Sequence, residues 1–168
     1  MHADNSTLAP ISKTSPATLD NPAMGFAGDL GEVDYWAFDA LAASLPAGQK
    51  LGVVLAPVST AELRLSVEGS EPGKKVEVPP NVAVLVPERP GESRRIVTVK
   101  VARGLDVNDP YFLAFFTPKA GKPLLAAVRR LHKDGQREEA QKLVNAALAL
   151  MPNAAWAGKA KELLARPE

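Results

Sequence analysis

Three acidic residues crowd one short stretch of the sequence and are the best candidates for a metal site. Asp29, Glu32 and Asp34 could offer carboxylate oxygens, and calcium takes six to eight oxygen ligands. However, Gly31 and Val33 alternate with the acids, and no dense string of ligands appears. A turn in which carboxylates accept backbone hydrogen bonds explains the same residues more simply. We therefore expect no cofactor, and keep calcium at Asp29, Glu32 and Asp34 as the alternative.

Side chains suited to catalysis are scarce among the 168 residues. Cysteine is absent, which removes thiol nucleophiles and cysteine-ligated zinc. His132 lies near the end of a predicted helix beside Lys133 and Asp134, where a cation complements the helix dipole. No serine stands in a Gly-x-Ser-x-Gly elbow. The lysines of Gly73–Lys75 and Gly121–Pro123 lack the rest of a phosphate-binding loop. We therefore expect that the protein is not an enzyme.

Charge and hydropathy exclude two classes of partner. The formal net charge is +1, but residues 1–116 hold 10 basic and 14 acidic side chains, whereas 117–168 hold 10 and 5. Acidic residues are interspersed in this basic tail, as on solvated helix faces, and the basic stretch Arg94–Arg103 carries no aromatic residue for base stacking. We expect no nucleic-acid partner.

The longest apolar runs have six residues, and a membrane span needs about 20, so no membrane span is expected.

The elements that must position these residues are mostly short strands. Residues 1–20 are rich in Ser, Thr, Asn and Pro and are expected to be a flexible lead-in. Within 21–117, period-two alternation predicts seven or eight short strands with no helix between them, which is typical of an antiparallel β-sandwich or barrel. The clearest strands are Val33–Phe38, Leu51–Leu55, Leu63–Val67, Val82–Val86, Ile96–Val101 and Tyr111–Phe116.

After Thr117 the apolar period becomes helical. Residues 118–123 are expected to be a linker that ends in a proline suited to the first turn of a helix. Leu124, Val128 and Leu131 then share one face, and Gly135 and Pro152 separate further helical stretches. We therefore expect a mainly β chain with a tail of three helices over residues 124–168.

The first two helices carry a family-like pattern. The turn Gly135–Ala140, then Ala147 and Pro152, fall at characteristic spacings, and Leu124 and Leu131 fill two first-helix positions. This stretch resembles one tetratricopeptide repeat, although Val128 stands at the usual glycine and Val144 at a common aromatic. The resemblance implies a helical hairpin, with residues 154–166 as its capping helix.

The β region carries one distinctive strand, Asp34-Tyr35-Trp36-Ala37-Phe38. Five further segments, spread over residues 17–117, carry less specific patterns: Ala17–Leu19, Gly28–Leu30, Ala47–Val53, Ala61–Leu65 and Pro110–Leu113. Together with the strand, these segments resemble the bacterial pre-peptidase C-terminal domain. The chain departs from that family in the insertion-like Leu41–Leu45 and in lacking a glycine-rich tract before the final strand. The resemblance implies a jelly-roll-like sandwich of a secreted protein, without catalysis of its own; some such domains bind extracellular polymers or calcium.

A single helical repeat cannot bury its apolar face alone, because such arrays usually need about three repeats. The apolar face must therefore find the sandwich of the same chain, a second copy, or another protein. The residues expected to bind a partner are Leu143, Val144, Ala147, Leu148, Trp156, Leu163 and Leu164. The favoured function is a non-enzymatic secreted or cell-envelope scaffolding module, with the sandwich as anchor and the helical tail as the docking surface.

A competing function keeps the helices purely structural. The chain would then be an accessory domain that binds calcium or an extracellular polymer, either a polysaccharide or a matrix protein. The start Met1-His2-Ala3-Asp4 suits the head of a mature secreted protein, so a periplasmic or extracellular location is expected. A cytoplasmic location stays open.

Overall fold

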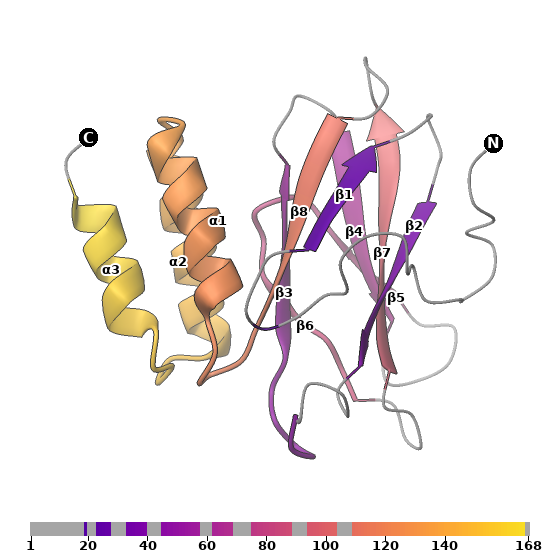
Figure 1. Cartoon of the computed structure of the whole chain (residues 1–168), viewed down its shortest axis with the longest axis horizontal. Coiled ribbons are helices and arrows are strands. Elements are labelled where there is room, and N and C mark those ends of the chain that lie inside the picture. The colour runs from indigo at the N-terminus through magenta and orange to yellow at the C-terminus, as the bar shows by residue number, and fades with distance from the viewer. Residues whose placement is uncertain are drawn as a thin grey trace.

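The computed structural model describes residues 19, 23–27, 33–39, 45–57, 62–68, 75–88, 94–103 and 109–166. Within these ranges eight strands precede three helices (Figure 1). The strands are β1 (Ala23–Ala27), β2 (Val33–Asp39), β3 (Gly52–Pro57), β4 (Glu62–Glu68), β5 (Lys75–Val78), β6 (Val84–Leu85), β7 (Arg94–Arg103) and β8 (Asp109–Phe116). The helices are α1 (Lys122–Lys133), α2 (Arg137–Leu150) and α3 (Ala157–Ala165). The expected order, a β region followed by a helical tail, is confirmed.

The strands form two four-stranded sheets. The first sheet has the order β1-β8-β3-β6, and the second has the order β2-β7-β4-β5. Every pairing between the described strands is antiparallel. Neighbours in a sheet are mostly distant in sequence, and β8 contacts both β1 and β3. The last strand of the chain therefore lies inside the first sheet, directly before the helices begin.

One hydrophobic core lies between the two sheets. Because successive side chains of a strand point to opposite faces, Tyr111, Leu113 and Phe115 of β8 share one face and enter this core. Leu63 and Leu65 of β4 enter it from the second sheet. We call it the inter-sheet core; its other buried members are Trp36, Phe38, Leu51, Val53, Leu55, Val67, Val86, Val97 and Val99.

A second core lies between the first sheet and the helices, and we call it the helix–sheet core. Phe116 and Ala114 of β8 and Val54 of β3 enter it from the sheet, because they alternate with the residues of the inter-sheet core. From the helices come Leu124, Val128, Leu131, Ala140, Leu143, Val144, Ala147, Trp156, Ala160 and Leu163. Figure 1 shows the three helices on one side of the sheets, beside β8 and β3. β8 and β3 of the first sheet therefore bury side chains on both of their faces.

The helix boundaries follow from local residues. Pro123 fits the first turn of α1, and the last turn carries the basic residues Arg130, His132 and Lys133. Gly135 has a φ of 77°, a left-handed conformation that favours glycine, and it separates α1 from α2. The helix begins at Lys122, so the expected linker 118–123 is shorter by two residues.

Two strands were not among the sequence predictions, and one is shorter than predicted. β1 and β5 pair at sheet edges; β1 has no alternating pattern, whereas β5 alternates charged residues with valine over four residues only. Only Val84–Leu85 of the predicted strand Val82–Val86 is paired. Of the expected flexible segment 1–20 only Leu19 is described, and its half-buried side chain packs against the inter-sheet core.

Candidate functional site

The candidate calcium ligands fall mostly outside the described residues. Asp29 and Glu32 lie outside the described residues. Asp34 lies in β2, where its backbone is opposite Val99 of β7. Within the described ranges no group of three or more His, Cys, Asp and Glu residues could hold a metal ion. Calcium at the acidic turn therefore stays a prediction.

The residues expected to bind a partner lie inside the molecule, and this assignment is corrected. Five of the seven have at most 7% of their surface exposed and belong to the helix–sheet core: Leu143, Val144, Ala147, Trp156 and Leu163. Leu148 and Leu164 are half-buried against the same core. The physical reason is that the helices pack on one another and on the first sheet of the same chain, so their apolar faces are already covered. A partner could reach most of these side chains only by displacing a helix or the sheet; Leu163 lines a groove described below.

Trp156 shows how firmly the tail is joined to the sheet. Its ring lies edge-on to the Phe116 ring, with 5.7 Å between centroids and an interplanar angle of 89°. The Ala155 amide also donates to the Pro118 carbonyl at 2.7 Å. Trp156 therefore acts as an anchor of the tail, which is the first of the three fates expected for the apolar face.

A groove between α1 and the first sheet is the best candidate for a binding site. We call it the α1–β8 groove; it has a volume of about 450 Å³ and is open to solvent. Its apolar lining, which we call the floor, consists of Phe112 of β8, its sheet neighbour Ala56 of β3, and Ala126 and Ala127 of α1. Its rim consists of Arg129, Arg130, Lys133 and Asp134.

The rim of the α1–β8 groove is cationic. Three cations face one carboxylate, which gives a net formal charge of +2. The Arg130 guanidinium lies 5.2 Å from the centre of the Phe112 ring, and its Nε is 3.8 Å from the Asp134 carboxylate. Both side chains of that pair are 47% exposed, so the pair contributes at most about 1 kcal/mol. The ring contact and the ion pair together hold Arg130 over the apolar floor.

Two cations of the rim have no ionic partner among the described residues. Arg129 and Lys133 are exposed, and neither side chain forms a hydrogen bond or ion pair with the part of the chain that the structure describes. They stand four residues apart on α1, where like charges disfavour the helix by about 0.2–0.5 kcal/mol. The C-terminal end of the helix dipole offsets this cost. Dipole complementation explains why cations stand here, but it does not explain the apolar floor beside them.

A second groove lies on the other side of the last turns of α1. It has a volume of about 600 Å³ and shares Arg129, Lys133 and Asp134 with the α1–β8 groove. Its remaining described lining is His132, Gly135, Leu163 and Arg166. The Nε2 atom of His132 is buried and has no hydrogen-bond partner among the described residues. Arg129 and Lys133 therefore line both grooves.

We compared the chain with known proteins. No family model, curated protein or solved structure matches it. Among the described residues, none of the three helices is long and apolar enough to cross a membrane. The assignment of function therefore depends on the geometry of this chain.

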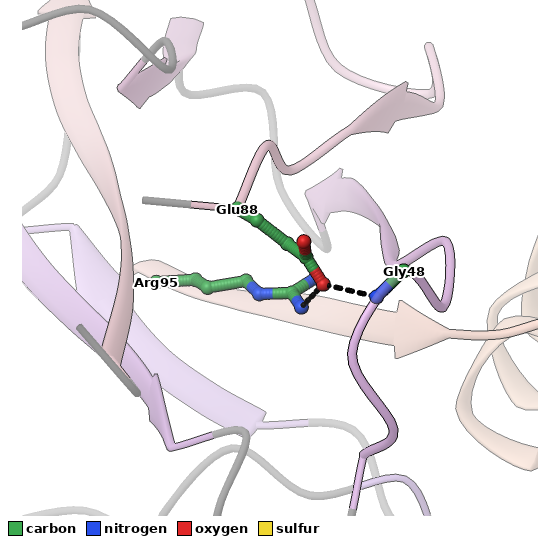
Figure 2. Close-up of polar contacts among 3 residues, drawn as sticks. All are labelled: Gly48, Glu88 and Arg95. Carbon is green, nitrogen blue, oxygen red and sulfur yellow. Dashed lines mark hydrogen bonds and ion pairs between the residues drawn. The ribbon is translucent and has the colours of Figure 1, made fainter. Parts of the chain in front are cut away.

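One buried charge lies away from the grooves. Arg95 precedes Val97 and Val99 on the same face of β7, and its side chain is only 5% exposed. Figure 2 shows that one carboxylate oxygen of Glu88 accepts from Arg95 Nη2 at 3.2 Å and from the Gly48 amide at 2.6 Å. Because Glu88 neutralises Arg95 and joins the turn at Gly48 to β7, we assign this cluster a structural role.

Sequence reasoning missed the groove, although part of its signal was present. The cluster Arg129-Arg130 with Lys133 is visible in the sequence, where it indicated only a solvated helix face. Phe112 lies in a six-residue apolar run that gives no sign of which side chains stay accessible. Their proximity depends on the packing of α1 against β8, which no local pattern encodes.

Proposed function

We propose that the chain is a non-enzymatic protein-interaction module of a secreted or cell-envelope protein. In this proposal the sheets and helices form one rigid scaffold, and a partner protein docks at the α1–β8 groove instead of the apolar face of the tail. The observation that carries the proposal is an accessible apolar floor beside two cations, Arg129 and Lys133, that lack a partner among the described residues. Such a surface offers both apolar burial and charge complementarity to a partner.

Within this proposal the β region is a jelly-roll-like sandwich of the pre-peptidase C-terminal kind. Its support is the pair of facing sheets and the strand that carries Trp36 and Phe38, both of which are buried in the inter-sheet core. The helices are proposed to be a tetratricopeptide-like hairpin with α3 as its cap. Gly135 at the turn between α1 and α2 and the buried small residues Ala140 and Ala147 support this assignment. A periplasmic or extracellular location is proposed from the resemblance of the β region to the pre-peptidase C-terminal domain.

One observation favours a second function. Because five of the seven apolar residues of the tail are buried in the helix–sheet core, the helices have a structural role that an accessory domain would also require. In this alternative the chain binds calcium at the acidic turn, or an extracellular polymer, and no partner protein docks on it.

A selection of displayed peptides on the immobilised full chain tests the two functions. The module predicts that a random 12-residue library yields peptides that bind the chain in solution with saturable one-to-one stoichiometry. Thermal melts with calcium chloride and with heparin, a soluble acidic polysaccharide, run in parallel. If no peptide binds, and calcium raises the melting temperature of the chain but not of Asp34→Ala, the accessory function replaces the module.

A further inference from the structure

We infer that the α1–β8 groove binds a short acidic segment of a partner protein that carries one apolar side chain. The inference rests on the proposed function and names its site and the chemistry of the partner. The apolar side chain would cover Phe112, and flanking Asp or Glu residues would pair with Arg129 and Lys133. Three observations lead to this assignment.

The first observation is the shape and chemistry of the floor. Phe112 is half-buried, and it lines the open groove together with the small side chains of Ala56 and Ala127, so part of this apolar surface stays accessible beside Arg130. An apolar side chain of a ligand would remove this surface from water at about 25 cal/mol per Å² of apolar area.

The second observation is the position of the cations. Arg129 and Lys133 are one helical turn apart on α1, a rise of about 6 Å. Alternate residues of an extended segment lie about 6.6 Å apart, so two carboxylates of one segment can meet both cations. Neither cation would have to leave an existing ionic partner among the described residues.

The third observation is the preorganised guanidinium of Arg130. The Phe112 ring supports its face at 5.2 Å, which leaves its N–H edge for a carboxylate, since guanidinium donors lie in the plane of the group. Its present partner, Asp134, lies at 3.8 Å and is half-exposed. An incoming carboxylate can therefore replace a weak surface pair at little cost.

Fluorescence anisotropy of the full chain tests the inference. The probe is a fluorescein-labelled peptide with the core Asp-Glu-Leu-Asp-Glu, and a peptide with Lys in place of every acid is the charge control. We expect saturable binding of the acidic peptide only. The double variant Arg129→Gln/Lys133→Gln should weaken it at least 10-fold, and replacing Leu of the peptide by Ser should weaken it at least 5-fold.

A matched variant controls for the loss of two positive charges. Lys159 and Lys161 are exposed on α3, outside the lining of both grooves, so Lys159→Gln/Lys161→Gln should bind the acidic peptide within 2-fold of the unchanged chain. Melting temperatures of both variants verify that they fold. Equal effects of the two double variants would overturn the inference, because binding would then follow net charge alone.

Two further outcomes separate the inference from the proposed function. If displayed peptides bind the Arg129→Gln/Lys133→Gln variant as well as the unchanged chain, the groove is not the site, although the module stands. If heparin or vesicles with 30% anionic phosphatidylglycerol bind through Arg129 and Lys133 while no peptide does, the partner is not a protein segment and both proposals fail.

Discussion

The indole of Trp156 donates a hydrogen bond from Nε1 to the main-chain carbonyl of Thr117 at 2.8 Å. Thirty-nine residues separate the two along the chain, and the bond joins the start of α3 to the residue directly after β8. The Thr117 hydroxyl in turn accepts from the Ala120 amide at 3.0 Å. The connection between sheet and helices is therefore a fixed, buried corner, and its stability can be tested by substitution.

Gly121 at this corner should not tolerate a side chain. A Cβ at Gly121 would overlap the ring of Trp156. The φ of Gly121, −130°, is one that any residue adopts, so the lack of space alone requires glycine here. We expect Gly121→Ala to lower the free energy of unfolding by about 1–3 kcal/mol, measured by urea denaturation.

Gly158 in α3 provides the matched control. Beyond the helix's own backbone and the adjacent residues, no described atom lies within 4 Å of the position where its Cβ would stand, and alanine favours a helix over glycine by up to about 1 kcal/mol. Gly158→Ala should therefore be neutral or stabilising. If Gly121→Ala were as stable as Gly158→Ala, the corner would be looser than the structure shows.

Removal of the tail should expose the first sheet. A chain that ends at Pro118 would uncover Val54, Ala114 and Phe116, each at most 1% exposed in the full chain. Because large apolar patches promote association, we expect this shortened chain to aggregate or unfold. Light scattering measures the outcome, with the full chain in the same buffer as control. A soluble, folded monomer would show that the helices are only lightly docked.

The contrast between two strands explains how much of the fold could be predicted. In β4 the buried Leu63 and Leu65 alternate with Arg64 and Ser66, so one face is apolar and the sequence predicts a strand of a single core. In β8 the run Tyr111–Phe116 is apolar throughout, and the structure shows that alternate side chains enter two different cores. Continuous apolar runs are typical of strands that are covered on both faces, so the sequence did contain that information.

The pairing between distant segments could not be predicted. Phe116 lies opposite Gly52 in the sheet, and a Cβ at Gly52 would overlap the Phe116 ring. The glycine is therefore needed for packing, but its partner is 64 residues away and no local pattern names it. The same limit applies to Arg130 and Phe112, whose contact places the candidate site. The three helices and most strands were predictable, whereas the site arises from their packing.

The hydrogen bond between Trp36 and Tyr111 should stabilise the inter-sheet core. Trp36 Nε1 donates to the Tyr111 hydroxyl at 2.9 Å, and both residues are at most 3% exposed. Tyr111→Phe would leave the indole N–H buried without its acceptor, which costs about 1–3 kcal/mol. Urea denaturation measures this loss.

A double-mutant cycle tests whether the effect belongs to this pair. Trp36→Phe removes the donor, so the double variant should lose less stability than the sum of the single variants, by about 0.5–3 kcal/mol. Strict additivity would mean that the hydrogen bond contributes nothing measurable.

The ion pair of Arg95 and Glu88 should matter more than an exposed pair of similar length. The Arg95 side chain is 5% exposed and Glu88 is 49% exposed, so Glu88→Gln leaves a buried guanidinium without its carboxylate. The Gln side-chain oxygen can still accept from the Gly48 amide, so this substitution isolates the charge. The free energy of unfolding should fall by more than for an exposed pair, which contributes about 0.2–1 kcal/mol, and by less than for a fully buried pair, whose disruption costs roughly 3–5 kcal/mol.

The surface pair of Arg166 and Glu162 is the control for this prediction. Its atoms lie 3.5 Å apart and its side chains are 62% and 65% exposed, so Glu162→Gln should change the free energy of unfolding by less than about 0.5 kcal/mol. Arg95→Met combined with Glu88→Gln should recover most of the loss, because an apolar side chain suits the end of the inter-sheet core. Urea denaturation measures the free energy of unfolding of all these variants. If Glu88→Gln costs no more than Glu162→Gln, then water, and not Glu88, compensates the charge of Arg95.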